Sequence, residues 1–392
     1  MGITCLVGLQ WGDEGKGKII DLIAKDFDFV ARYQGGPNAG HTIYINGKKI
    51  VFHQIPSGIL HKHIIAVLGP GMVIDLKILL DEINLIKTMF DLKGKLYISE
   101  RAHIILPKHK EIDKKNSYIG TTKKGVGPCY EDKYGRRGIV MKYILQPNVL
   151  KTTLERLGSF NKNLYQELLE YGKILNQYIA DTTEILHDAI EHKKRILAEG
   201  AQGSLLDIEH GTYPFVTASH TIAGGASCGL GIGPLYIEEV IGVLKAYVTR
   251  VGEGPLPTHM DETLEKRLRE AGQEFGATTG RPRRLGWFDV PLARYAIKLN
   301  SATKLVLTKI DVLDSLPYIK ICHSYRNSPW DESPEPLFET LQGWQTSTKG
   351  ITSYKDLPHN AKKYINRLEE LLNQKFYLIS TGKEREQFIL CD

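Results

Sequence analysis

A glycine-rich stretch near the amino terminus carries the residue types that bind phosphate. It runs from Gly12 to Lys18 and holds three glycines, two lysines, Asp13 and Glu14. An apolar run over residues 3–9 precedes it, and apolar residues at helical spacing follow it. A strand, a glycine-rich turn and a helix form the setting in which backbone N–H groups at a helix N-terminus hold phosphate. The stretch therefore predicts a phosphate-binding loop, against the alternative of a strand-to-helix turn with solvated lysines.

The stretch departs from the usual P-loop at one position. Gly12, Gly17 and Lys18 have the P-loop spacing, but Ile19 stands where a Ser or Thr holds magnesium. Asp13 lies inside the loop and carries a carboxylate. We therefore expect Asp13 to supply the missing metal oxygen, or to perform a step that an ordinary P-loop does not.

A lysine and a carboxylate follow a later strand-like run. Lys309 and Asp311 stand directly after the apolar residues 304–307. A carboxylate accepts hydrogen bonds from both N1–H and the N2 amino group of guanine, whereas adenine offers no such pair of donors. The lysine stem can lie along the ring face. Beside a phosphate loop this pair favours GTP as the nucleotide; a salt bridge at a strand end is the alternative.

Two further loops carry groups suited to anion binding and catalysis. Residues 277–284 place three arginines beside two threonines, and planar guanidinium groups suit carboxylates and phosphates. A solvated basic turn is the alternative. His41 lies in a second glycine-rich loop, residues 34–42, which holds too many glycines for a packing role. We therefore expect His41 to take part in catalysis rather than to be an ordinary loop histidine.

The elements that position these loops alternate along the chain as strand-like runs and helical stretches. This pattern is typical of an α/β protein with a mostly parallel central sheet flanked by helices. Strand-like runs over residues 3–9, 195–199, 241–249, 304–307 and 376–379 each end in a loop of small or polar residues. Ligands of open α/β sheets bind at the carboxyl ends of strands, so we expect these loops to converge on one crevice.

The remaining segments complete the predicted layout. A hairpin is expected over residues 42–52 with its turn at Asn46-Gly47, then a strand over 64–68 and a helix over 76–89. Residues 107–137 are polar and basic, which indicates a disordered excursion or a lid that orders on a ligand. Residues 147–193 are expected to form an all-helical insertion without catalytic residues.

Composition narrows the class of protein. The 392 residues are 42% hydrophobic and 24% charged, with a net charge of +6, as in ordinary globular proteins. No basic tract interleaved with aromatic residues is present, so nucleic acid is not an expected partner. Five scattered cysteines without metal-type spacing indicate reduced thiols. The sequence has no membrane-span pattern and no leader pattern, so we expect no membrane association and a cytoplasmic protein.

Seven blocks of the sequence resemble the adenylosuccinate synthetase family. They cover residues 10–18, 35–42, 119–128, 200–217, 276–287, 308–311 and 380–382, in the family's order. The resemblance extends from end to end and implies one α/β domain over residues 1–392. The chain is shorter than the usual bacterial form, near residues 147–193 and 325–337, and His220 stands where Asn is more usual.

The resemblance implies a GTP-dependent ligation of IMP and L-aspartate. The products are adenylosuccinate, GDP and phosphate, and the intermediate is 6-phosphoryl-IMP, in the first committed step from IMP to AMP. The C6 oxygen of IMP is a poor leaving group, and its phosphorylation makes it a good one. In the family pattern Asp13 takes the N1 proton of IMP, and His41 stabilises charge on the phosphoryl group and O6. The family's metal is Mg²⁺, held by Asp13 and the Gly40 carbonyl.

The resemblance also assigns the ligand contacts residue by residue, and it implies a homodimer in which Arg136 serves the partner's site. The implied catalytic residues are Asp13, Lys16, His41 and Gln202. IMP contacts are implied for Asp13, Glu14, Gly15, Lys16, Asn38, Ala39, Gly40, His41, Thr122, Arg136, Gln202, Thr217 and Arg281. GTP contacts are implied for Gly12, Asp13, Glu14, Gly15, Lys16, Gly17, Lys18, Gly40, His41, Thr42, Arg283, Lys309, Ile310, Asp311, Ser380, Thr381 and Gly382. Aspartate contacts are implied for Ala277, Thr278, Thr279, Gly280, Arg281, Pro282 and Arg283.

Two other functions compete with this interpretation. A phage-type relative makes the 2-amino analogue of adenylosuccinate from dGMP, but it lacks the aspartate in the phosphate loop that this chain has as Asp13. A GTP-binding regulatory module would use the nucleotide as a switch and would leave the arginine cluster of residues 281–284 without a purpose. Consumption of GTP only when IMP and aspartate are both present distinguishes the enzyme from such a module.

Overall fold

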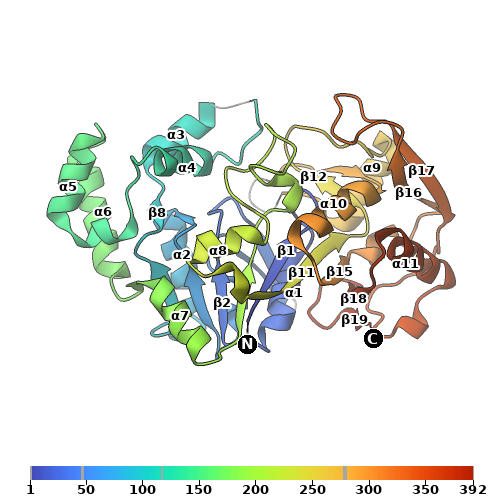
Figure 1. Ribbon diagram of the computed structural model, residues 1–392, viewed down its shortest axis with the longest axis horizontal. Helices are drawn as coiled ribbons and strands as arrows, with labels where there is room; N and C mark the ends of the chain where they lie inside the picture. The colour runs from blue at the N-terminus through green and yellow to red at the C-terminus, as the bar shows by residue number, and fades with distance from the viewer. Residues whose placement is uncertain (1, 46–47, 116–117, 277–279, 392) are drawn as a thin grey trace.

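A ten-stranded sheet forms the centre of the computed structural model, which describes residues 2–45, 48–115, 118–276 and 280–391 (Figure 1). The strand order is β19 (Phe388–Leu390), β18 (Phe376–Ser380), β15 (Lys304–Thr308), β11 (Ile237–Lys245), β1 (Ile3–Gly8), β10 (Ile196–Glu199), β2 (Phe29–Arg32), β5 (Ile65–Leu68), β7 (Leu96–Ser99) and β9 (Ile179–Ala180). All neighbouring strands pair in parallel except β18 and β19. The predicted α/β class with a mostly parallel sheet is confirmed.

Helices flank the sheet, and four small sheets lie around it. The helices are α1 (Lys16–Ala24), α2 (Leu76–Lys87), α3 (Pro107–Lys115), α4 (Val126–Tyr134), α5 (Pro147–Arg156), α6 (Lys162–Leu175), α7 (Thr182–Glu191), α8 (Gly224–Leu230), α9 (Glu262–Gly272), α10 (Val290–Asn300) and α11 (His359–Leu372). The small sheets join β3 (His41–Ile45) to β4 (Lys48–Phe52), β6 (Val73–Ile74) to β8 (His103–Ile104), β12 (Val248–Arg250) to β13 (Arg284–Gly286), and β14 (Phe288–Asp289) to β16 (Tyr318–Tyr325) and β17 (Pro336–Gln342).

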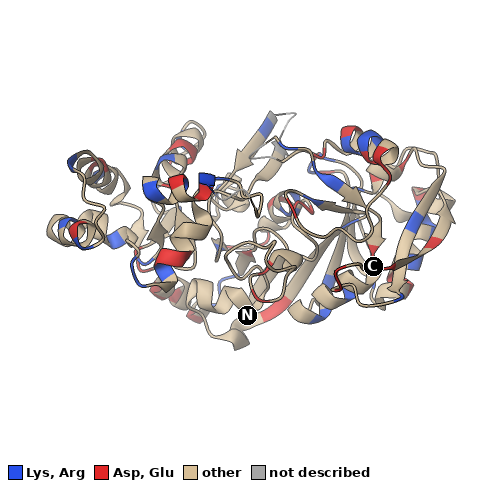
Figure 2. Ribbon diagram, turned by 90° about the horizontal axis from the view of Figure 1, so that it is seen from above, with Lys and Arg blue, Asp and Glu red and all other residues tan. Residues whose placement is uncertain are grey.

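The central strands are apolar throughout because both faces of the sheet are covered. Cys5 and Val7 of β1 belong to a core cluster that includes residues of α8 and α10. Leu6, which points to the other face, packs with Ile19 and Ile20 of α1. Figure 2 accordingly shows few charged residues on the central strands and many on the outlying helices. The helix that follows the phosphate loop is thus fixed to the sheet by its apolar side.

The carboxyl ends of β1, β10, β11, β15 and β18 lie at one edge of the sheet, because these strands are adjacent and parallel. The loops that follow them begin at Leu9, Gly200, Ala246, Lys309 and Thr381. The expected convergence of these loops is confirmed, and it brings together segments that are up to about 370 residues apart in the chain.

Two sequence expectations about secondary structure were wrong, and so was one of the two alternatives stated for a third segment. The single strand expected over 241–249 is two strands, β11 and β12, and β12 leaves the central sheet to pair with β13. At the break, the side-chain amide of Gln10 donates to the carbonyls of Lys245 and Tyr247, each at 3.2 Å. This side chain satisfies backbone groups that a continuous strand would have paired with a neighbour.

The polar segment 107–137 is not a disordered excursion over its described length; the alternative, a lid that orders on a ligand, stays a prediction. It contains α3 and α4, which pack on each other beside the sheet (Figure 1). Buried polar residues hold the pair, because the carboxylate of Asp113 accepts a hydrogen bond of 2.8 Å from Gly125 N at the start of α4. Average polarity hid this, since the buried positions are few.

The segment 147–193 is not all helical. α5 and α6 project at one end of the molecule (Figure 1), but Ile179–Ala180 forms β9 at the edge of the central sheet, and α7 then packs against the core. The predicted hairpin over 42–52 is present as β3 and β4, whereas its turn, Asn46-Gly47, lies outside the described residues. The predicted helix at 76–89 is α2, and the Asp75 side chain caps its first turn.

Two further features concern disulfide bonds and membrane-spanning helices. None of the five cysteines, all of which lie within the described ranges, takes part in a disulfide bond. Within the described ranges, no helix combines the length and apolar character that crossing a bilayer requires.

Candidate active site

The phosphate loop is closed from beneath by the carboxylate of Glu14. This fully buried carboxylate accepts hydrogen bonds from Gln10 N at 3.1 Å, Gly12 N at 2.9 Å and Lys16 Nζ at 2.5 Å. Gly12, Asp13 and Gly15 all have positive φ, which lets the backbone bend around this carboxylate. Glu14 can therefore offer a ligand its backbone but not its carboxylate.

Lys18 points away from the phosphate loop and toward the carboxyl end of β18. Its ammonium group donates to Ser380 Oγ at 2.8 Å and to the carbonyls of Gly382 and Gln387, each at 2.7 Å. Burial lowers its pKa to about 8, an effect that the Asp311 carboxylate opposes. The expected GTP-contacting lysine thus acts in this structure as a tie between α1 and the 380–387 segment.

His41 is held by a carboxylate that the sequence analysis did not assign. Its Nδ1 pairs with Glu199 Oε1, and Glu199 also accepts from Ser57 N at 2.9 Å and Ser57 Oγ at 3.0 Å. Burial lowers the pKa of His41, and the ionised Glu199 opposes that change. This pairing fixes the ring orientation and leaves Nε2 as the nitrogen that can face a ligand.

Glu199 had one signal in the sequence. It is the last residue of a strand-like run and directly precedes the Gly200 loop. An acid at the carboxyl end of a buried strand is either paired or functional, because an isolated charge there is costly. That argument selects Glu199 as a candidate but not His41 as its partner, since residues 41 and 199 meet only through the fold.

Gln202 presents an amide without hydrogen-bond partners among the described residues. Both its Oε1 and Nε2 atoms are inaccessible to solvent and unpaired there. A Cβ placed on Gly12 would lie 3.5 Å from Gln202 Cα, so Gln202 adjoins the phosphate loop. On its other side, a Cβ placed on Gly35 would lie 3.2 Å from Gln202 Oε1 and 3.6 Å from Asn38 Oδ1. Buried unpaired amides are uncommon and indicate a ligand position.

The second glycine-rich loop joins this group through Asn38 and His41. Asn38 Nδ2 donates to Thr217 Oγ1 at 3.4 Å, so two of the expected IMP contacts touch each other. A Cβ on Gly17 would come within 3.0 Å of His41 Cβ, which shows how closely α1 approaches β3. The structure thereby brings the phosphate loop, Asn38, His41, Gln202 and Thr217 into one continuous cluster.

The arginine segment is anchored, so the alternative of a solvated basic turn is wrong for its described residues. Arg283 is 7% exposed; its Nη1 binds Glu274 and its Nε lies 2.9 Å from Asp13 Oδ2. Arg281 donates to the carbonyls of Gly120 at 2.8 Å and Thr121 at 3.3 Å, next to the expected contact Thr122. Ala277, Thr278 and Thr279 lie outside the described residues.

Lys309 and Asp311 do not form the strand-end salt bridge that was the alternative to guanine binding. The ammonium of Lys309 donates to Gly272 O at 2.7 Å and to Glu274 Oε1 at 3.0 Å. Asp311 has no ion-pair partner within the described part of the chain. Burial raises the pKa of Asp311, an effect that Lys309 opposes. Its carboxylate is therefore available to hydrogen-bond donors of a ligand.

Arg136 is not joined to the cluster by contacts within the described part of one chain. It follows α4 with φ 59° and is exposed, while its neighbour Arg137 is bound to Asp132 Oδ1 at 3.2 Å. The side chain of Arg136 thus projects outward from a fixed backbone.

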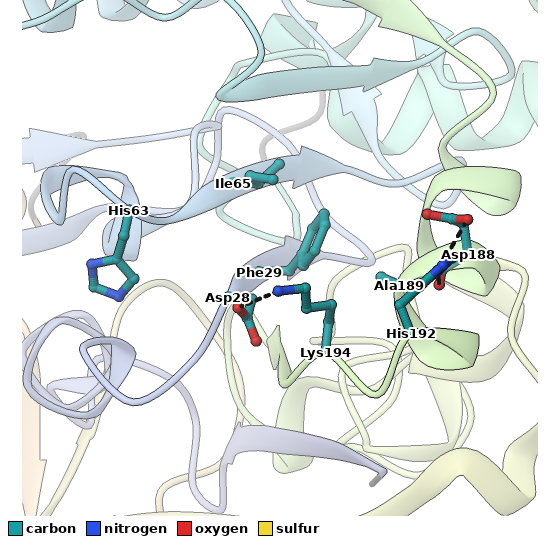
Figure 3. Close-up of a pocket in the computed structure, with 8 residues that line it drawn as sticks. All are labelled: Asp28, Phe29, His63, Ile65, Asp188, Ala189, His192 and Lys194. Carbon is teal, nitrogen blue, oxygen red and sulfur yellow. Dashed lines mark hydrogen bonds and ion pairs between the residues drawn. The ribbon is translucent and has the colours of Figure 1, made fainter.

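A separate surface pocket of about 380 Å³ lies at the opposite end of the strands (Figure 3). Phe29 and Ile65, which begin β2 and β5, line it, and its charged groups pair with each other: Lys194 with Asp28 at 3.4 Å and His192 with Asp188 at 3.2 Å. The candidate site is therefore the group of loops at the carboxyl ends of the strands and not this pocket.

A parallel α/β sheet with these groups at its carboxyl edge defines a nucleotide-dependent enzyme that transfers a phosphoryl group. A family model described as adenylosuccinate synthetase matches residues 5–389. Proteins named adenylosuccinate synthetase from Thermodesulfovibrio yellowstonii and Caldanaerobacter subterraneus are 45% and 46% identical over 420 and 430 residues, covering 100% of this chain and 99% of each relative. This chain therefore belongs to the adenylosuccinate synthetase family.

Solved structures agree with the assignment. The fully ligated adenylosuccinate synthetase of Plasmodium falciparum matches with a TM-score of 0.95 at 36% identity and covers 100% of both chains. A succinoaminodeoxyadenylate synthetase of cyanophage S-2L bound to dGMP and dATP matches at 0.69 and 20% identity, over 99% of this chain and 95% of that one, which shows a shared fold alone. The chain is a GTP-dependent ligase of AMP biosynthesis that joins IMP and L-aspartate.

The packing around Glu14 predicts that Gly203→Ala destabilises the protein. A Cβ at residue 203 would lie 2.3 Å from Gln10 O and 2.6 Å from Gly12 N, so the phosphate loop would have to shift. We expect a loss of about 1–3 kcal/mol in urea unfolding, with reduced activity. Gly127→Ala in α4 is the matched control, because nothing lies within 4 Å of its added Cβ. Equal stability of the two variants would contradict the close packing of residue 203 against the phosphate loop.

The His41–Glu199 pair predicts that Glu199→Gln lowers kcat. The Gln amide has one acceptor oxygen in place of two, so it cannot accept from both Ser57 N and Ser57 Oγ, and it no longer stabilises a protonated His41 ring. We expect kcat to fall by about 10²–10⁴, the usual range of a general acid–base contribution. Steady-state kinetics should show little change in the three KM values. Glu191→Gln, exposed at the end of α7, is the control. A kcat close to that of the wild type would remove His41 positioning from the mechanism.

Proposed function

We propose that Asp13, His41, Lys16 and Gln202 carry the chemistry of the family reaction in this chain. The observation that supports this most is the clustering of the first two with the unpaired amide of Gln202 around one loop. Gly12 abuts Gln202, and Gly17 abuts His41, so these side chains surround the same small volume. Three groups with different proton and hydrogen-bond roles in one place suit a reaction in two steps.

In the first step the carboxylate of Asp13 accepts the N1 proton of IMP. Charge then builds on O6, which attacks the γ-phosphorus of GTP; the bond to the β–γ bridging oxygen breaks and GDP leaves. His41, through Nε2, stabilises the transferring phosphoryl group and O6, while the Gln202 amide orients the purine. In the second step the aspartate amine attacks C6 and inorganic phosphate leaves, which gives adenylosuccinate.

Mg²⁺ is proposed at Asp13 and the Gly40 carbonyl. The donor set fits, because magnesium in phosphoryl-transfer sites takes one or two protein oxygens and completes its shell with phosphates and water. The Asp13 side chain is 30% exposed, so one carboxylate oxygen remains accessible beside its ion pair with Arg283. When bound, the ion neutralises charge on the β- and γ-phosphates.

The remaining ligand contacts are proposed as the family pattern places them. GTP lies along Gly12 to Lys18, with guanine at Lys309, Ile310, Asp311 and the segment Ser380-Thr381-Gly382, while Gly40 and Thr42 adjoin the γ-phosphate. The ties from Lys18 to Ser380 and Gly382 support this arrangement, since they hold the base and phosphate subsites together. L-Aspartate lies at residues 277–283, where Arg283 also reaches the phosphates.

IMP is proposed to bind Asn38, Ala39, Thr122, Thr217 and Arg281, in a cytoplasmic homodimer. The contact of Asn38 with Thr217 and the bonds from Arg281 beside Thr122 support one shared IMP subsite. The outward side chain of Arg136 supports its use by a partner subunit. The whole chain is proposed to form one domain with this one active site.

A coupled absorbance assay tests the proposed function. Repeated turnover of GTP should require both IMP and L-aspartate, because without aspartate the first step can cleave at most one GTP per site; Asp13→Asn should abolish turnover. Replacement of IMP by dGMP tests the phage-type alternative. Sustained turnover of GTP without aspartate, or preference for dGMP, would overturn the proposal.

Hybrid dimers test the shared site. Arg136→Leu should raise the KM for IMP because the partner's site loses a cation. Mixed with the inactive Asp13→Ala, it should restore one working site per hybrid dimer. Activity of the mixture should therefore exceed that of either variant alone. Mixtures that never do so, despite subunit exchange shown by mass spectrometry, would place the whole site in one chain.

Asp311→Asn tests the guanine contact. The change turns one acceptor into a donor, which mismatches guanine but suits xanthine, whose C2 carries an oxygen. A buried group without a partner costs about 1–3 kcal/mol, so wild type should disfavour ATP by at least about tenfold. The variant should lose affinity for GTP and gain it for xanthosine triphosphate, with kcat little changed. Kinetics with the three triphosphates decide it, and an unaltered preference for GTP would mean that another residue reads the base.

A further inference from the structure

One buried carboxylate outside the family motifs contacts both halves of the proposed site. Glu274 follows α9 and is fully buried. Its Oε1 accepts from Lys309 Nζ at 3.0 Å and Lys245 Nζ at 3.0 Å, and its Oε2 accepts from Arg283 Nη1. A carboxylate has acceptor sites for about four donors, and these three cations occupy three of them.

The two outer partners of Glu274 serve different substrates under the proposed function. Lys309 begins the loop that carries Asp311 and the guanine subsite. Arg283 lies at the end of the aspartate segment, and its Nε is 2.9 Å from Asp13 Oδ2 in the phosphate loop. A single side chain therefore links the base subsite to the loop where the phosphoryl group is transferred.

The third partner, Lys245, reaches no substrate. Its side chain has 0% exposure, and its ammonium donates to Thr249 Oγ1 at 2.6 Å as well as to Glu274. Tyr247 also donates its hydroxyl to Glu274 Oε1, which closes the cluster on the core side. Lys245 and Tyr247 thus hold the Glu274 carboxylate in one position. It therefore does not move with the long side chains of Lys309 and Arg283.

We propose that Glu274 is a positioning residue that sets Arg283 and Lys309 at a fixed separation, and so couples guanine binding to aspartate binding. The proposal rests on the roles proposed above for these two cations. Three cations share this one fully buried carboxylate, and among the described residues only Arg283 forms an ion pair with a second one, Asp13. Loss of the Glu274 charge would leave the cations repelling one another, and the two that face ligands would move.

A purely structural role for Glu274 would give a different result. Charge balance in the core would affect folding alone, and the protein that does fold would bind its substrates normally. A positioning residue would change binding of GTP and aspartate together in protein that is folded. IMP is the internal reference, because Asn38 and Thr217, two of its proposed contacts, lie outside the cluster.

Glu274→Gln is the test, because the amide keeps the shape but removes the charge. We expect KM for GTP and KM for L-aspartate to rise together by at least about tenfold, because each displaced cation loses a charged hydrogen bond to its own ligand. KM for IMP should change by less, because Asp13 alone of its proposed contacts is paired with a cation of this cluster. Glu270→Gln, exposed on α9, is the matched control. A double-mutant cycle with Arg283→Lys should be strongly non-additive in KM for aspartate.

A second variant keeps the proposal testable if Glu274→Gln does not fold. Glu274→Gln combined with Lys245→Met removes the buried cation that has no ligand role, so it should restore the unfolding temperature but not the two KM values. Normal KM values in either folded variant, or a rise in only one of the two, would overturn the coupling role. A wild-type enzyme that does not require IMP and aspartate would instead overturn the proposed function.

Discussion

The buried carboxylate of Glu14 is the interaction on which the rest of the site depends. The phosphate loop turns around it, because Gln10 N, Gly12 N and Lys16 Nζ all donate to this one group. The turn leads directly into α1, whose first turn has no side-chain cap, and the first backbone N–H groups of a helix are the ones suited to hold phosphate. The close approach of Gly203 to the same carboxylate then brings the loop after β10 against it.

Cations tie several other loops to this closed turn or to one another, in addition to the apolar packing of Trp11 with Leu205 and Leu256. Lys18 binds the 380–387 segment, and Arg283 lies against Asp13 while it binds Glu274. Lys309, beside the proposed guanine contact Asp311, binds Glu274. Each cation thus joins two different segments of the chain. The proposed substrate subsites are thereby held at fixed separations, although the loops themselves contain little secondary structure.

The sequence predicted the parts of this arrangement that are local. The alternation of strands and helices, the phosphate loop and Asp311 are all visible within a few residues of chain. The partners that depend on packing were not predictable, because Glu199 meets His41 only where β10 lies beside the second glycine-rich loop. The helices within residues 107–137 were not predicted for a related reason: Asp113 in α3 is polar yet buried, so composition indicated a loop.

Burial separates two uses of carboxylates that composition cannot distinguish. Glu14, Glu199 and Glu274 have no solvent exposure, and their oxygens accept hydrogen bonds from groups of the protein itself. Asp13 and Asp311 are partly accessible at the carboxyl edge of the sheet and have acceptor capacity for ligands. Removal of a bracing acid leaves buried cations or N–H groups unpaired, whereas removal of a ligand-facing acid leaves the fold intact. The buried acids Glu14, Glu199 and Glu274 must therefore be positioned as exactly as the residues proposed to touch substrate. A cation that shifts would displace the ligand-binding groups around it.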